Sequence, residues 1–291
     1  MSNRKGIILA GGTGSRLHPL TIAVSKQLMP IYDKPTIYYP LATLMQAGIR
    51  DILIITTPQD QQHFVNLLKD GEQFGINISY ASQAKPNGLA EAYIIADECG
   101  FLKGEPSAMI LGDNIFHGNE SFINCLIAAN ASQLNTIFAY RVANPSAYGV
   151  VTFDEAQRVV SLEEKPANPK SDFAVPGIYF FDEGAPDIAR SLKKSPRGEL
   201  EIMDMCKAYI NHNRLVVNRV PEGVAWLDSG THETLIDAAQ YVRIIEQRQG
   251  HKIACLEEIA LQKEWIDKED VERQITKLGK STYCDYLKKL I

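Results

Sequence analysis

Short apolar runs and amphipathic stretches alternate along the first half of the chain. Runs of strand length predict β-strands at residues 5–10, 51–57, 77–81, 108–111 and 136–142. Between them, apolar residues at helical spacing predict helices that run from Ile37 to a stop at Gly48, and over residues 89–99 and 121–131. Because strands alternate with helices, we predict an α/β fold with a Rossmann-like, mostly parallel mixed sheet that has helices on both faces.

The pattern changes at Gly149 to short, β-rich pieces at residues 149–154, 159–166 and 175–182. We expect these to form antiparallel strands that lie over the sheet. A long helix with one apolar stripe then follows Asp228, with Thr231 as its cap and Gly250 at its end. Residues 251–291 are amphipathic, rich in Lys and Glu, and predict a helical tail.

Composition and charge exclude several classes of protein. Of the 291 residues, 45% are hydrophobic and 22% are charged, as in ordinary globular proteins. The net charge of -5 gives no basic footprint for nucleic acid. The cysteines are odd in number and lack zinc-site spacing, which indicates reduced thiols. No apolar run has a membrane span's length or a signal peptide's pattern, so we expect a cytoplasmic protein without membrane contact.

A glycine-rich loop, GGTGSRLHPLT at residues 11–21, directly follows the first predicted strand. Gly11, Gly12 and Gly14 allow backbone N–H groups to approach an anion, and Arg16 adds donors that suit phosphate oxygens. The loop is not a Walker motif, which needs G-x-x-x-x-G-K-[ST]. It also fails the dinucleotide fingerprint, because the sixth position from Gly12 is Leu17, and this disfavours a dehydrogenase. The sequence therefore predicts another kind of phosphate-binding loop.

Two aspartates follow apolar runs that predict strand ends. Asp113 comes after residues 108–111, and Asp228 comes after residues 224–227. Ligands bind beyond the carboxyl ends of strands in open α/β sheets, and Mg²⁺ prefers one or two carboxylates together with phosphate oxygens. Taken singly, each aspartate is more typical of a turn or a helix cap than of a metal site.

Several motifs follow one another along the chain: the glycine loop, SKQLMP at 25–30, LGDN at 111–114, SLEEKP at 161–166, PRGELEI at 196–202 and AWLDSGTHETL at 225–235. This collinear set resembles the motifs of the sugar nucleotidylyltransferases, and within them the branch that joins dTTP to glucose 1-phosphate. The resemblance runs from about Lys5 to the C-terminus. It implies conversion of dTTP and α-D-glucose 1-phosphate to dTDP-glucose and pyrophosphate, the first step of dTDP-deoxysugar biosynthesis of the dTDP-rhamnose type. It also implies Mg²⁺ as cofactor and a homotetramer. The implied core spans residues 1–250, with a nucleotide half at about 1–148 and sugar-binding insertions at about 149–227. The tail at 251–291 is then expected to make oligomer or regulatory contacts.

The resemblance also assigns roles to individual residues. It places catalysis on Arg16, Lys26 and Lys165, with Lys165 on the sugar phosphate, and metal binding on Asp113 and Asp228. The implied nucleotide-binding residues are Leu9, Gly11, Gly12, Gly14, Ser15, Arg16, Gln27, Gln83, Gly88 and Asp113. The implied sugar-binding residues are Asn114, Tyr148, Gly149, Glu164, Lys165, Val175 and Tyr179. An amide such as that of Gln83 offers the acceptor and donors needed to read the imide edge of thymine or uracil.

Departures from the family pattern leave alternatives open. Pro176 stands where threonine is usual, and Met203-Asp204-Met205-Cys206 is more apolar than the usual Thr-Asp-x-Asn, so sugar selectivity stays open. A uridylyltransferase, or a nucleotidylyltransferase for another hexose 1-phosphate, is one alternative. A non-catalytic nucleotide-sugar sensor is another, although a sensor does not need the whole charged set from Arg16 to Asp228.

Overall fold

The first strand, β1 (Lys5–Ala10), lies inside the central sheet of the computed structural model, which describes residues 4–291. Ile7 and Ile8 point to opposite faces and are both fully buried, as expected for a strand covered on both sides. β1 pairs in parallel with β4 (Asp51–Thr56) and β6 (Ser107–Leu111), and β4 pairs in parallel with β5 (Asn77–Ser82). The parallel half of the sheet thus matches the predicted strands.

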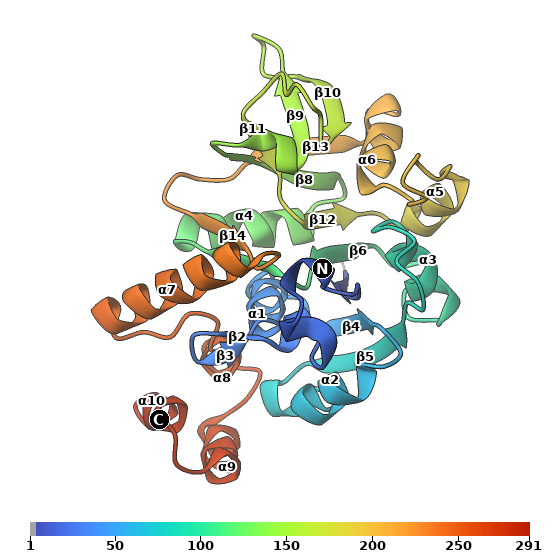
Figure 1. The fold of residues 1–291 in the computed structure, drawn as a ribbon. Coiled ribbons are helices and arrows are strands. Elements are labelled where there is room, and N and C mark those ends of the chain that lie inside the picture. Colours follow the sequence, from blue (N-terminus) through green and yellow to red (C-terminus); the bar gives the residue numbers. More distant parts are fainter. Residues whose placement is uncertain (1–3) are drawn as a thin grey trace.

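The other half of the ten-stranded sheet is mostly antiparallel (Figure 1). Its strands are β8 (Asn135–Arg141), β9 (Gly149–Phe153), β10 (Val159–Glu164), β11 (Phe173–Val175), β12 (Ile178–Phe181) and β13 (Leu215–Arg219). The order is β10-β9-β11-β8-β12-β6-β1-β4-β5, and β13 pairs in parallel with β8. The expected mixed sheet is confirmed.

The β-rich pieces do not lie over the sheet, so that expectation is wrong. β11 pairs with β8 and β9, and β10 pairs with β9, so these strands extend the sheet at the top of Figure 1. An open strand edge carries unpaired N–H and C=O groups that a further strand satisfies. The run at 175–182 divides at Pro176 into β11 and β12, because proline has no N–H for a ladder bond.

Helices cover both faces of the sheet. The helices on one face are α1 (Tyr38–Gln46), α2 (Gln61–Leu68) and α4 (Glu120–Ala131), and those on the other are α3 (Glu91–Glu98), α5 (Ala185–Ser191) and α6 (Ile202–Asn211). Strand alternation divides the core between them. Ile8 and Ile54 pack with the first group, whereas Ile7 and Ile55 pack with the second.

A separate antiparallel ribbon joins β7 (Asn114–His117) to β14 (Ala225–Asp228). Asp228 therefore ends a ribbon strand, which corrects the expectation that it ends a strand of the parallel sheet. The long helix α7 (His232–Gln249) follows as predicted. Thr231 caps it by accepting from the Thr234 N–H, and Gly250 ends it in the left-handed region at φ 73°.

The predicted helical tail consists of α8 (Leu256–Gln262), α9 (Lys268–Leu278) and α10 (Thr282–Leu287). Leu256, Ile259 and Leu287 belong to the same apolar core as α1, so the tail packs against the body of the protein. Within residues 4–291 we find no helix that is long and apolar enough to cross a membrane.

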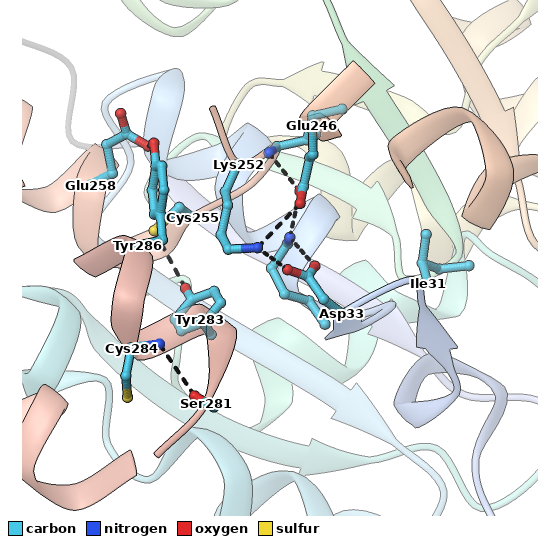
Figure 2. A network of polar contacts seen from close by, with 12 residues as sticks. Ile31, Asp33, Glu246, Lys252, Cys255, Glu258, Ser281, Tyr283, Cys284 and Tyr286 are labelled. Carbon is cyan, nitrogen blue, oxygen red and sulfur yellow. Dashed lines mark hydrogen bonds and ion pairs between the residues drawn. The ribbon is translucent and has the colours of Figure 1, made fainter. Parts of the chain in front are cut away.

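A buried cluster of four charges joins the end of α7 and the segment after it to the hairpin of β2 (Pro30–Ile31) and β3 (Lys34–Pro35), as Figure 2 shows in part. Lys34 contacts Asp33 and donates to Glu246 over 2.8 Å, and Lys252 contacts the same two carboxylates. The Lys34 side chain is only 1% exposed. Burial alone would raise the pKa of Asp33, but the two ammonium groups outweigh it and lower that pKa. The stabilisation of the fold by the ion pairs of Asp33 is therefore present at neutral pH and is lost as the pH falls through the lowered pKa of Asp33.

Removing one carboxylate from this four-charge cluster should destabilise the fold strongly. Glu246→Gln leaves two ammonium groups to share Asp33 in a buried place, and we expect a loss of about 3 kcal/mol in the free energy of unfolding. Urea unfolding followed by circular dichroism measures it. Arg141→Ala is the control, because it breaks an ion pair to Asp172 whose arginine is 78% exposed and should change little. Equal midpoints for the two variants would contradict the prediction.

Candidate active site

The glycine loop leaves β1 in a conformation that requires glycine. Gly12 and Gly14 have φ values of 98° and 59°, in the region that other residues avoid. A Cβ at Gly14 would also crowd Thr21, whose hydroxyl donates to the Gly14 carbonyl over 2.7 Å. Arg16 follows in the short 3-10 helix Ser15–Leu17. The loop shape that the sequence predicts is therefore present.

Asp113 lies beside this loop because β6 runs parallel to β1. The Gly112 N–H donates to the Leu9 carbonyl over 2.9 Å, which continues the β1–β6 pairing past the end of β6. Lys26 forms an ion pair with Asp113, and both side chains are mostly buried. Burial alone would raise the pKa of Asp113, but the Lys26 ammonium outweighs it and lowers that pKa. Asp113 is thus a carboxylate at neutral pH.

A cavity of about 320 Å³ opens beside these two residues. Predicted site residues that line it are Arg16, Asp113, Asn114, Tyr148, Gly149, Glu164, Lys165, Val175, Tyr179 and Asp228. The other predicted residues lie in β1, along the glycine loop, in the 3-10 helix Lys26–Leu28 and in the loop after β5; they are Leu9, Gly11, Gly12, Gly14, Ser15, Lys26, Gln27, Gln83 and Gly88. Leu89 lines the cavity, so the loop that carries Gly88 forms part of its wall.

Asp228 is held by its neighbours at the cavity wall. It accepts from the Tyr148 hydroxyl over 3.1 Å, from Thr234 over 3.1 Å and from the Gly230 N–H over 3.0 Å. Burial, together with this carboxylate, raises the pKa of Tyr148 to about 12, so the hydroxyl stays a donor. The Ser229 N–H donates to the Asp113 carbonyl, which brings the two aspartate segments together.

The donor set around the two aspartates fits magnesium only with help from a ligand. Within residues 4–291 no group of three or more His, Cys, Asp and Glu side chains could hold a metal. Two carboxylates at one cavity still match the preference of Mg²⁺ for one or two carboxylates completed by phosphate oxygens and water. The chemistry of the residues therefore suits a metal that arrives with a phosphate ligand.

The amide oxygen of Asn114 is already occupied by protein donors. It accepts from the Gly177 N–H over 3.1 Å and from the Trp226 indole over 2.7 Å, and the Asn114 NH₂ donates to Asp113. A sugar hydroxyl that binds Asn114 would therefore have to share the amide oxygen and NH₂ group with these protein partners. The sequence did not single out Trp226, although its place two residues before Asp228 was a usable signal.

Glu164 and Lys165 line the cavity on its β-rich side, and Glu164 has a cationic neighbour that the sequence analysis missed. Arg197 lies 3.5 Å from Glu164 and donates to Glu201 over 2.7 Å. Burial raises the pKa of Glu164, and the nearby cations of Lys165 and Arg197 oppose the rise. Lys165 has φ 43°, a left-handed conformation that is uncommon for lysine. The motif PRGELEI contained Arg197, but nothing in one sequence placed it near Glu164.

Met203, which the sequence analysis noted only as a departure from the family pattern, explains why position 149 is glycine. Met203 lines the cavity, and a Cβ at Gly149 would lie 2.7 Å from its sulfur. The close approach therefore needs glycine, and Met203 adds an apolar surface to the cavity. The apolar departure from the family pattern therefore lies in the wall of the cavity.

The loop that carries Gln83 and Gly88 is joined to the segment at 196–202. The Leu200 N–H donates to the Asn87 carbonyl over 2.7 Å, and the Leu200 carbonyl accepts from the Ala90 N–H. Gly88 has φ 107°, and a Cβ there would overlap the Leu200 backbone. Gly88 is thus required for this contact, and its predicted part in base binding stays a prediction.

Comparison with known proteins defines the class. Residues 5–244 match the family model described as nucleotidyl transferase, and the chain belongs to this family. It is 54% identical over 288 residues to the glucose-1-phosphate thymidylyltransferase of Mycolicibacterium smegmatis, which covers 99% of both chains. It is 51% identical over 291 residues to that of Xanthomonas campestris pv. campestris, which covers 100% of this chain and 98% of the relative.

A crystal structure gives the same result for the fold. It is of a Bacillus anthracis protein assigned as a glucose-1-phosphate thymidylyltransferase, in complex with sucrose. The match has a TM-score of 0.75 and 36% sequence identity, and it covers 82% of this chain and 95% of the other.

Adding a methyl group at Gly88 should disturb the junction with Leu200. Gly88→Ala meets the Leu200 backbone as well as an unfavourable φ, so we expect a larger fall in melting temperature than for Gly198→Ala. Gly198 is the matched control, because it has φ 80° but no atom within 4 Å of an added Cβ. The left-handed conformation alone costs roughly 1–2 kcal/mol. Equal melting temperatures would show that the contact does not constrain this loop.

Proposed function

We propose that this chain is a glucose-1-phosphate thymidylyltransferase, which converts dTTP and α-D-glucose 1-phosphate to dTDP-glucose and pyrophosphate. The observation that carries the proposal is one cavity. Arg16, Lys165 and the two aspartates line it together with the predicted sugar-binding residues of the β-rich strands. Relatives of that name that match the full chain support the same activity. The product would enter the biosynthesis of dTDP-deoxysugars.

The residues on the cavity walls suit a direct transfer. An oxygen of the sugar phosphate attacks the α-phosphorus of dTTP, and the bond to pyrophosphate breaks. Both substrates are anions, so catalysis depends on positioning and charge compensation. We assign Arg16 and Lys26 to the triphosphate and leaving group, because both lie at the glycine-loop side. Lys165, on the opposite β-rich wall, is assigned to the sugar phosphate.

Asp113 and Asp228 are the residues that would hold Mg²⁺. When bound, the ion neutralises charge on the phosphate oxygens. The hydrogen bonds from Tyr148 and Thr234 keep the Asp228 carboxylate turned toward the cavity. We further propose a cytoplasmic homotetramer with its nucleotide half at about 1–148 and its sugar-binding insertions at about 149–227.

The substrate preference tests the proposed activity. Pyrophosphate release, measured over a grid of nucleoside triphosphates and hexose 1-phosphates, should be fastest with dTTP and glucose 1-phosphate. UTP should follow, because a methyl group in an apolar pocket is worth about 1–3 kcal/mol. CTP, ATP and GTP should be negligible. Turnover of purine triphosphates as fast as dTTP would overturn the assignment, and binding of dTDP-glucose without turnover would favour the sensor.

Replacing the metal carboxylates should abolish turnover and leave the fold in place. Asp113→Asn and Asp228→Asn are each expected to lower kcat at least about a hundredfold, because several kcal/mol of charge stabilisation would be lost. Asp187→Asn is the control, since that side chain is 88% exposed and outside the cavity. Near-normal kcat in either variant, with an unchanged melting temperature, would refute the metal assignment.

A further inference from the structure

The amide of Gln83 is held at its nitrogen and open at its oxygen. Nε2 donates to Glu91 over 2.6 Å and lies 3.4 Å from the Gly88 carbonyl. A carboxylate and a carbonyl can only accept, so the NH₂ group must face them. No group within residues 4–291 donates to Oε1 of Gln83. This acceptor is therefore available to a ligand.

The open oxygen faces the phosphate loop. A Cβ built on Gly11 would lie 3.2 Å from Oε1 of Gln83, so the oxygen lies over the first residue after β1. Gln83 itself is only 7% exposed. An acceptor in this place meets whatever part of a nucleotide extends from the phosphate loop toward α3.

Glu91 is held as firmly as the amide that it contacts. It is the first residue of α3, where the helix dipole favours a carboxylate. Its second oxygen accepts from the Asn87 side chain over 2.7 Å. Both carboxylate oxygens are thus engaged, and Glu91 can only present an acceptor to Gln83.

Turning the Gln83 amide over would be unfavourable while Glu91 is present. The amide oxygen would then face the Glu91 carboxylate and the Gly88 carbonyl, which places acceptors against an acceptor in a mostly buried site. Without Glu91, only the long contact to Gly88 would hold the NH₂ group, and that is a weak hydrogen bond. Glu91 therefore decides which end of the amide faces the ligand.

We propose that Glu91 is a positioning residue that sets the orientation of Gln83 and so makes the base site require a donor at N3. This inference rests on the proposed function. Thymine carries N3–H and can donate to Oε1 of Gln83. N3 of cytosine is an acceptor, so it would face the acceptor Oε1 without a hydrogen bond. Glu91 acts through Gln83 and need not touch the nucleotide.

Two nucleotides that differ only at this edge give the sharpest test. They are dTTP and 5-methyl-dCTP, which share the methyl group and the deoxyribose. In the wild-type protein dTTP should be strongly preferred. Glu91→Ala should lower the ratio of kcat/KM for dTTP over 5-methyl-dCTP by roughly tenfold, because water in the gap can donate or accept and no longer fixes the amide. Alanine also suits the first turn of α3.

Conservative and control variants separate positioning from mere structure. Glu91→Gln can still present an acceptor oxygen and should keep the ratio within about threefold of the wild type. Glu98→Ala removes the same charge from the far end of α3 and should not change the ratio. In a Gln83→Ala background, Glu91→Ala should have no further effect on the ratio, since the group it orients is gone.

The outcomes distinguish this inference from the proposed function. If the wild type makes dTDP-glucose but Glu91→Ala lowers kcat/KM equally for both nucleotides, Glu91 is only structural and the inference fails. If the wild type releases no pyrophosphate from dTTP and glucose 1-phosphate, the proposed function fails instead. If Glu91→Ala does not fold, Glu91→Leu takes its place, because leucine excludes water and offers no acceptor. This variant must then lower the ratio of kcat/KM for dTTP over 5-methyl-dCTP. An unchanged ratio in Glu91→Leu also overturns the inference.

Discussion

The parallel pairing of β1 with β6 is the constraint on which the candidate site depends. Leu9 pairs with Leu111, and the Gly112 N–H continues the ladder to the Leu9 carbonyl. The glycine loop and Asp113 therefore leave the sheet side by side, at the edge where parallel strands end. Because β1 is buried on both faces, a one-residue shift of this register would exchange the side chains that β1 gives to the two apolar cores, so the site geometry is coupled to the packing of the sheet.

The antiparallel strands bring the other cavity wall to the same edge. β12 runs opposite to β6, so its start at Ile178 lies beside the end of β6, and the Gly177 carbonyl accepts from the Leu111 N–H. Gly149 at the start of β9 pairs with Glu164 and with Val175, which end β10 and β11. Strand reversal thus gathers residues that are far apart in the chain at one end of the sheet.

Buried charges are paired with opposite charges both at the candidate site and where α7 meets the β2–β3 hairpin. Lys26 pairs with Asp113 in the cavity region, and the hairpin that follows Lys26 is held to α7 through Lys34 and Glu246. Buried charges need such partners, because an unpaired one would lose its hydration without compensation. The hairpin is therefore supported from α7.

The sequence by itself determined the local features of this protein. The strand at residues 5–10, the glycine loop and the cap of α7 at Thr231 were predictable because periodicity, positive φ and capping depend on near neighbours. The family was predictable because its motifs are collinear, while the roles of most site residues stay predictions. Only the tertiary structure decided that β9 to β11 extend the sheet, that Asp228 ends a ribbon, and that Arg197 and Glu91 face site residues. These features depend on backbone edges and side chains that meet across many residues, and one sequence carries no local signal for such meetings.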